Sequence, residues 1–114
     1  MNNMSHIDRE VYKTLCEILD DEMPSLVDEF ISDASLKVEE LKTLVKNNDA
    51  ENIFCISHSL KSSSANFGAM LMSDICKTLE TSSRSGNTED ATDLVCRLGE
   101  VLIATSDELR TLIK

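Results

Sequence analysis

Apolar side chains recur along most of the chain at the spacing of amphipathic helices, in segments separated by polar breaks. The first segment follows a possible capping box at Ser5 and Asp8 and ends at Asp20; its apolar positions are Ile7, Val11, Leu15, Ile18 and Leu19. The second is longer, because Pro24 suits the first turn of a helix and the stripe continues to residues 47–48; it comprises Val27, Phe30, Ile31, Ala34, Val38, Leu41 and Val45.

Three further segments show the same periodicity. Asp49 can cap a helix that Gly68 ends, with an inner face of Ile53, Ile56, Leu60 and Phe67. The next helix runs until the serine-rich residues 82–86 and carries Leu71, Met72, Ile75, Cys76 and Leu79. Thr88 and the acidic residues after it open the last helix, whose stripe is Leu94, Leu98, Val101, Leu102, Thr105, Leu109 and Leu112.

These segments predict an all-α fold. The chain contains one proline and three glycines, and it has no Asn-Gly or Asp-Gly pair that would mark a β-hairpin. Four amphipathic helices joined by links of about 2 to 5 residues pack most simply up-down-up-down. We therefore expect residues 1–114 to form a single domain, a four-helix bundle with a short N-terminal helix capping one end.

Net charge restricts the possible partners. The formal charge is −10, from 11 basic and 21 acidic residues. Such a field repels nucleic acid and anionic membranes, so a protein partner is favoured. No segment reaches the length of about 18 apolar residues that crosses a bilayer, and no signal peptide is evident. We expect a cytoplasmic protein, and a monomer because the apolar stripes are used up within one bundle.

The four cysteines are spaced too widely for a zinc ribbon or a thioredoxin-type motif. Cys16, Cys55 and Cys76 lie in apolar stretches, where a cysteine acts as a small core residue. We interpret these three and Cys96 as free thiols.

His58 is the side chain with the clearest chemical potential. On a helical wheel it falls about 140° from Ile53, away from the core direction. An exposed imidazole is largely neutral at cellular pH and offers a nitrogen that can attack phosphorus. Lys61 lies one turn further on the same side, where its ammonium would neutralise a bound phosphoryl group. His6, near the N-terminus, is interpreted as a solvated residue.

The segment around His58 resembles a known motif. Residues 57–69 read SHSLKSSSANFGA, and the phosphoacceptor motif of the histidine-containing phosphotransfer (HPt) domain family is written roughly H-x-L-K-G-S-S-x-x-x-G. The matching residues are His58, Leu60, Lys61, Ser63, Ser64 and Gly68, and the likeness extends to Cys76, Leu79 and Glu80. Ser62 is the main departure, because the family usually has glycine there.

The resemblance implies a phosphocarrier of a two-component phosphorelay. His58 would accept a phosphoryl group from a hybrid sensor histidine kinase or a receiver aspartate and donate it to a response-regulator receiver domain. Lys61 would stabilise the phosphoryl group, and Gly68 would let two helices turn. No cofactor is implied for this chain, because Mg²⁺ belongs to the receiver. A nucleotide-binding loop is absent, so the chain is not expected to be a kinase.

A partner is expected to dock on the flank around His58. The side chains assigned to that contact are Phe54, Ser62 and Ala65. Arg84 is a candidate for a second cation near the site, although a solvated residue in a serine-rich turn is the more usual interpretation.

Three alternatives remain open at this point. The same fold could serve as a docking module that is never phosphorylated. A metal site could use Cys55, His58 and Cys76, although only three ligands can be named. A hydrolase could use a serine from residues 62–64 with His58 as its base, but no orienting carboxylate or oxyanion hole can be placed.

Overall fold

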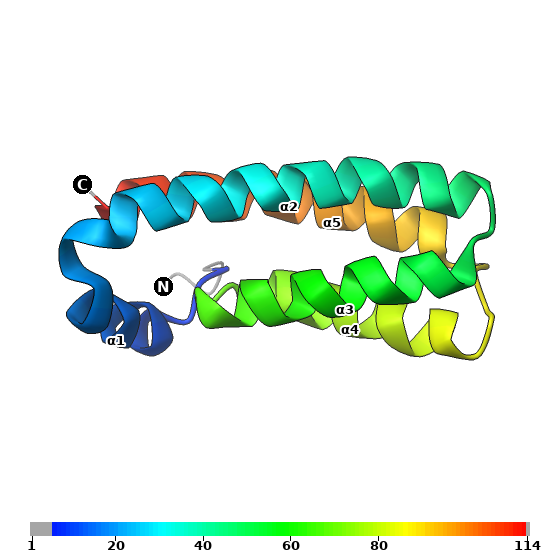
Figure 1. Ribbon diagram of the computed structural model, residues 1–114, viewed down its shortest axis with the longest axis horizontal. Coiled ribbons are helices and arrows are strands. Elements are labelled where there is room, and N and C mark those ends of the chain that lie inside the picture. Colours follow the sequence, from blue (N-terminus) through cyan, green and yellow to red (C-terminus); the bar gives the residue numbers. More distant parts are fainter. Residues whose placement is uncertain (1–5, 114) are drawn as a thin grey trace.

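The computed structural model describes residues 6–113, which form α-helices joined by short turns. Their bounds are α1 Arg9–Leu19, the 3-10 turn η1 Asp20–Glu22, α2 Met23–Lys46, α3 Ala50–Asn66, α4 Met70–Arg84 and α5 Ala91–Ile113. The four long helices run alternately up and down, and α1 lies across the end of the bundle where α3 passes into α4 (Figure 1). The predicted all-α bundle with a short capping helix is therefore confirmed.

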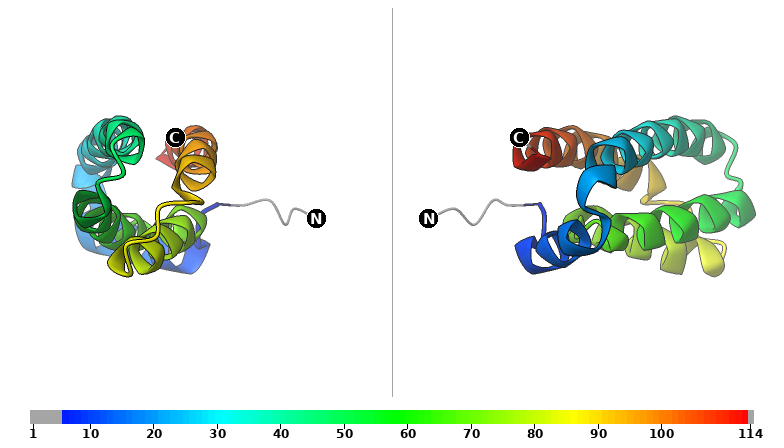
Figure 2. Two further views of the ribbon diagram at one scale, coloured as in Figure 1. Left: turned by 90° about the vertical axis from the view of Figure 1, so that its right-hand side faces the viewer. Right: turned by 60° about the vertical axis from the view of Figure 1, so that its left-hand side comes forward.

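The bundle is closed around its core. Each long helix packs against the next in sequence, and α5 returns to α2, as the view along the axis shows (Figure 2). The residues that are almost completely inaccessible come from all four long helices: Val27, Ala34, Leu41, Ile53, Leu60, Met72, Cys76, Leu79, Leu98 and Leu109. Burial of this apolar surface is what holds the helices together. None of the helices in the described part of the chain is both long enough and apolar enough to cross a membrane.

Aspartate side chains cap the first turns of α1 and α3. The Asp49 carboxylate accepts a hydrogen bond from the backbone N–H of Asn52, as predicted for α3. Asp8 caps α1 by accepting from two backbone N–H groups, so the cap lies three residues after the predicted cap Ser5, which is outside the described residues. The last helix begins at Ala91 rather than Thr88 because residues 89–90 form a turn, in which the Asn87 side chain accepts from the Glu89 N–H and the Thr88 carbonyl accepts from the Ala91 N–H.

Gly68 fixes the turn between α3 and α4. Its φ of +77° lies in the left-handed region that favours glycine. Its carbonyl accepts a hydrogen bond from the Asp8 N–H at 2.6 Å, and a Cβ on Gly68 would lie 2.7 Å from the Asp8 carbonyl oxygen. Gly68 is thus more than the expected helix stop, because α1 also docks directly against its backbone.

The cysteines are all free thiols, but their surroundings differ. Cys76 is buried in the core as predicted, and Cys16 is partly buried. The interpretation of Cys55 as a core residue is wrong. It is exposed because it lies two residues after the inward-facing Ile53, which is more than half a helical turn away.

Candidate phosphoacceptor site

Helix α3 presents His58 to solvent while anchoring the residues around it. Ile53, Ser57 and Leu60 are completely buried, and the Ser57 hydroxyl donates to the Ile53 carbonyl at 2.6 Å. The next residue, His58, points the other way, and 56% of its side chain is exposed. The predicted exposure of the imidazole is therefore observed, and it follows from the helical period of the surrounding apolar residues.

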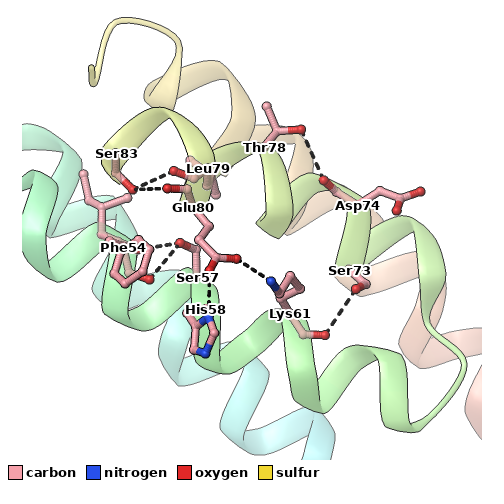
Figure 3. A network of polar contacts seen from close by, with 11 residues as sticks. Phe54, Ser57, His58, Lys61, Ser73, Asp74, Thr78, Leu79, Glu80 and Ser83 are labelled. Carbon is pink, nitrogen blue, oxygen red and sulfur yellow. Dashed lines mark hydrogen bonds and ion pairs between the residues drawn. The ribbon is translucent and has the colours of Figure 1, made fainter. Parts of the chain in front are cut away.

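Glu80 of α4 connects the two functional side chains predicted on α3. One carboxylate oxygen, Oε2, lies 2.7 Å from Nδ1 of His58. The other, Oε1, forms an ion pair with the Lys61 ammonium at 2.6 Å. Glu80 reaches from α4 to both His58 and Lys61 (Figure 3). Only 8% of its side chain is exposed, whereas the imidazole remains accessible.

The charge of Glu80 determines which imidazole nitrogen is free. Contact with the Lys61 ammonium and, second, with the His58 ring holds the pKa of the Glu80 carboxyl below its usual range, against the opposing effect of burial. The carboxyl is therefore ionised at neutral pH and accepts hydrogen bonds only. Nδ1 of His58 must then carry the hydrogen, which leaves the lone pair of a neutral ring on Nε2. Nε2 points away from Glu80 (Figure 3).

Lys61 lies on the same side of α3 as His58, as the sequence predicts, but its ammonium is already engaged with Glu80. An ammonium has three N–H donors, so this pairing leaves donors for an incoming anion. The Lys61 side chain is 30% exposed and reachable from solvent.

Phe54 and Arg84 form a stack with His58. The Phe54 and His58 rings are nearly parallel, with an interplanar angle of 17° and centroids 5.9 Å apart. The Arg84 guanidinium carbon lies 5.2 Å from the Phe54 centroid, within the range of a cation–π contact. Arg84 is therefore next to the site, although it is exposed and reaches Phe54 rather than the imidazole. Arg84 is thus solvent-exposed, as the interpretation of it as a solvated residue has it, and it also contacts a neighbour of His58.

Ser62 and Ala65 extend the face of α3 that carries His58. Ser62 is exposed one turn beyond the imidazole, and Ala65 is half-buried in the next turn. Both side chains are small, so they leave the approach to His58 open.

Glu80 is the functional residue to which sequence reasoning gave no role, although it matches the family. A signal was present, because Glu80 follows Leu79 and lies four residues after Cys76 on the inner face of its helix. A glutamate on such a face needs a charged or hydrogen-bonding partner. His58 lies 22 residues earlier in the sequence, and only the packing of α4 on α3 brings the pair together.

Two of the three alternatives, the metal site and the serine hydrolase, are not supported by the geometry. Cys55 is exposed, whereas Cys76 is buried with its thiol pKa raised by burial to about 12, so it does not provide the thiolate that binds metals. Among residues 6–113, no three His, Cys, Asp or Glu side chains are grouped for one metal ion. Ser64 is buried, and the Ser63 hydroxyl donates to the Leu60 carbonyl. Ser62 is exposed, but within residues 6–113 no hydrogen bond joins it to His58, so a serine nucleophile activated by His58 is not supported.

The second histidine lies elsewhere. The side chain of His6 is 20% exposed and lies near Glu108 of α5, whose carboxylate accepts a hydrogen bond from the His6 backbone N–H. The interpretation of His6 as fully solvated is therefore wrong, because this segment is held against α5.

Comparisons with known proteins agree with this geometry. The family model described as "Hpt domain" matches residues 25–113. Among solved structures, the chain is similar to the crystal structure of histidine-containing phosphotransfer protein B (HptB) from Pseudomonas aeruginosa PAO1. The two are 29% identical with a TM-score of 0.91, over 96% of this chain and 95% of that one. The search of curated proteins found no match.

Proposed function

The chain belongs to the Hpt domain family, and from that premise we propose that His58 is the residue that carries the phosphoryl group. The protein is an Hpt phosphotransfer protein of a phosphorelay, a phosphocarrier and not a kinase. Hpt domains relay phosphate between kinase and receiver domains. The observation that supports His58 is the exposed imidazole whose Nδ1 is bound to the buried Glu80 carboxylate.

In the proposed reaction, the Nε2 lone pair attacks phosphorus of an aspartyl phosphate in line with the bond that breaks. The N–P bond forms as the P–O bond breaks, and the aspartate leaves as a carboxylate. Nδ1 keeps its hydrogen, so the ring becomes positively charged as Nε2 is phosphorylated. The Glu80 carboxylate, 2.7 Å from Nδ1, stabilises that charge, and the reverse transfer uses the same contacts.

Lys61 is proposed to compensate the charge of the transferred group. Its ammonium is fixed by Glu80 at 2.6 Å, one turn from His58 on the same helix. Its remaining donors are available to a phosphoryl oxygen without loss of the Glu80 pair. We assign no cofactor to this chain and place Mg²⁺ in the acidic site of the receiver.

The charge distribution favours an acidic partner site. From Asn52 to Ser73 the sequence contains no aspartate or glutamate, although the chain has 21 acidic residues. This interval includes the exposed residues His58 and Ser62, so the face of α3 lacks the carboxylates that would repel a receiver's acidic site. Partners are therefore proposed to be receiver domains and a hybrid sensor kinase, docking over this face in the cytoplasm.

The test is transfer from a phosphorylated receiver domain to the purified protein. The chain has only two histidines, so His6→Gln is the matched control for His58→Gln. The wild type and the control should acquire acid-labile phosphate that maps to residue 58, and His58→Gln should acquire none while retaining its helicity. Lys61→Ala should slow the transfer without abolishing it. Undiminished labelling of His58→Gln would refute the proposal, and receiver binding without labelling of the wild type would indicate a docking module.

A further inference from the structure

The ring of Phe54 is already engaged by two neighbours. His58 is stacked on it at an interplanar angle of 17°, and the Arg84 guanidinium carbon lies over the ring, 5.2 Å from its centroid. The residue is half-buried, and its remaining exposed surface lines a hollow with Glu51, Ser83 and Gly86. A docking protein would therefore meet a ring that is largely occupied, which does not suit the role of an apolar partner contact.

The hydrogen bond to Glu80 does not by itself fix the imidazole. Nδ1 of His58 is bound to the buried Glu80 carboxylate. The ring plane can still rotate about that hydrogen bond, because the terminal side-chain torsion of histidine has a broad energy minimum. A parallel phenyl ring removes that freedom. Two contacts of different kinds, one at Nδ1 and one across the ring face, are sufficient to define the direction of the Nε2 lone pair, which lies in the ring plane.

We propose that Phe54 is a positioning residue for phosphoryl transfer, which sets the plane of the His58 ring while Arg84 holds Phe54 in place. This inference rests on His58 being the phosphoacceptor. In-line transfer requires the attacking lone pair to point at phosphorus, and a small misorientation of a reacting group lowers the rate substantially even when binding is unchanged. Phe54 would therefore act on the chemical step and not on docking.

Substitutions at position 54 separate these roles. Phe54→Leu keeps an apolar side chain but removes the flat face, and Phe54→Tyr restores it. With phosphorylated receiver as donor, Phe54→Leu should lower the transfer rate at saturating receiver about tenfold. The receiver concentration at half-maximal rate should stay within about twofold of wild type. Phe54→Tyr should recover most of the rate, and Arg84→Gln, which leaves Phe54 unrestrained, should lower it about threefold.

A spectroscopic readout tests the positioning directly. The His58 ring protons of the free protein should show the ring-current shift of a stacked phenyl group, and this shift should be lost in Phe54→Leu and retained in Phe54→Tyr. If Phe54→Leu raises only the half-maximal receiver concentration, Phe54 is a partner contact and the inference is overturned. A slower transfer with an unchanged ring-current shift would overturn it equally.

A small phosphodonor distinguishes failure of this inference from failure of the proposed function. Phosphoramidate transfers its phosphoryl group to an imidazole nitrogen with release of ammonia and needs no docking. His58 of Phe54→Leu should still be labelled by it at about the wild-type rate, which shows that the nucleophile is intact. If His58→Gln still accepts phosphate from the receiver, the proposed function fails whatever the Phe54 variants do.

Discussion

Glu80→Gln is the substitution that examines the site most directly. It keeps the size of a side chain that is only 8% exposed, but it removes the charge that holds both His58 and Lys61. A neutral amide can accept from Nδ1–H through its oxygen or donate to Nδ1 through its nitrogen. The requirement that Nδ1 carry the hydrogen is therefore lost, and a fraction of the molecules will have Nε2 blocked by a hydrogen.

The size of the effect follows from the exposure of the ring. Loss of a carboxylate that sets a buried catalytic histidine's tautomer can cost about 10⁴ in rate. The His58 side chain is 56% exposed, so water can exchange the ring hydrogens and the variant can reach the reactive tautomer. The expected increase in activation free energy is then the loss of one charge-assisted hydrogen bond. At the lower end of its range this bond contributes about 1.5 kcal/mol, which corresponds to about tenfold in rate.

The assay is single-turnover transfer from a phosphorylated receiver, compared with Asp74→Asn. Asp74 is an exposed carboxylate earlier on α4, so this control makes the same charge change on the same helix but outside the site. Glu80→Gln should be about tenfold slower than the control, and ¹⁵N spectra of the His58 ring should show a larger share of the tautomer protonated at Nε2. Equal rates in the two variants would refute the role given to Glu80.

Three further predictions concern stability, measured as the free energy of unfolding in urea. Folding lowers the pKa of Glu80, so the charge of its carboxylate stabilises the folded state. This stabilisation is fully present above the ordinary pKa of 4.5 and is lost as the pH falls through the lower folded value. The difference in unfolding free energy between wild type and Glu80→Gln should therefore shrink below pH 4.5. Gly68→Ala should destabilise by about 2 kcal/mol or more, because φ is +77° and the new Cβ would meet the Asp8 carbonyl; an unchanged stability would contradict this. Ser64→Ala should be neutral or stabilising by up to about 1 kcal/mol, because the buried Ser64 hydroxyl has no hydrogen-bond partner among residues 6–113, and a clear loss would show that the hydroxyl is satisfied.

The helices and the exposure of His58 were predictable because both depend on local periodicity. A stripe of apolar residues at helical spacing fixes which side of each helix is inside, and the imidazole of α3 falls outside that stripe. The interpretation of Cys55 was wrong because the apolar residues next to it in the sequence suggested a core position, whereas its position on the helical wheel is about 200° from the buried Ile53. The start of α5 was also misplaced, because residues 89–90 form a turn before the helix begins at Ala91.

The bond between His58 and Glu80 was not predictable in this way. It depends on the register of α3 against α4, which periodicity within one helix does not reveal. The contact of Arg84 with Phe54 depends on the same register, whereas Phe54 and His58 lie four residues apart on α3 and are neighbours by the helical period alone. Only the positions of His58 and Arg84 in space show that the Phe54 ring is already engaged.

The register of α3 against α4 therefore connects the turn at Gly68 with the chemistry at His58. The Ser73 hydroxyl of α4 donates to the Lys61 carbonyl of α3 at 3.2 Å, between the turn and the Glu80 contacts. A shift of α4 by one residue would move Glu80 about 1.5 Å along the helix and turn it by about 100°, which is enough to break contacts of 2.7 and 2.6 Å. Gly68 lies at the start of that register, and its carbonyl accepts the Asp8 N–H. We therefore expect Gly68→Ala to disturb the Glu80 contacts as well as the turn, and unchanged ¹⁵N signals of the His58 ring in this variant would contradict that expectation.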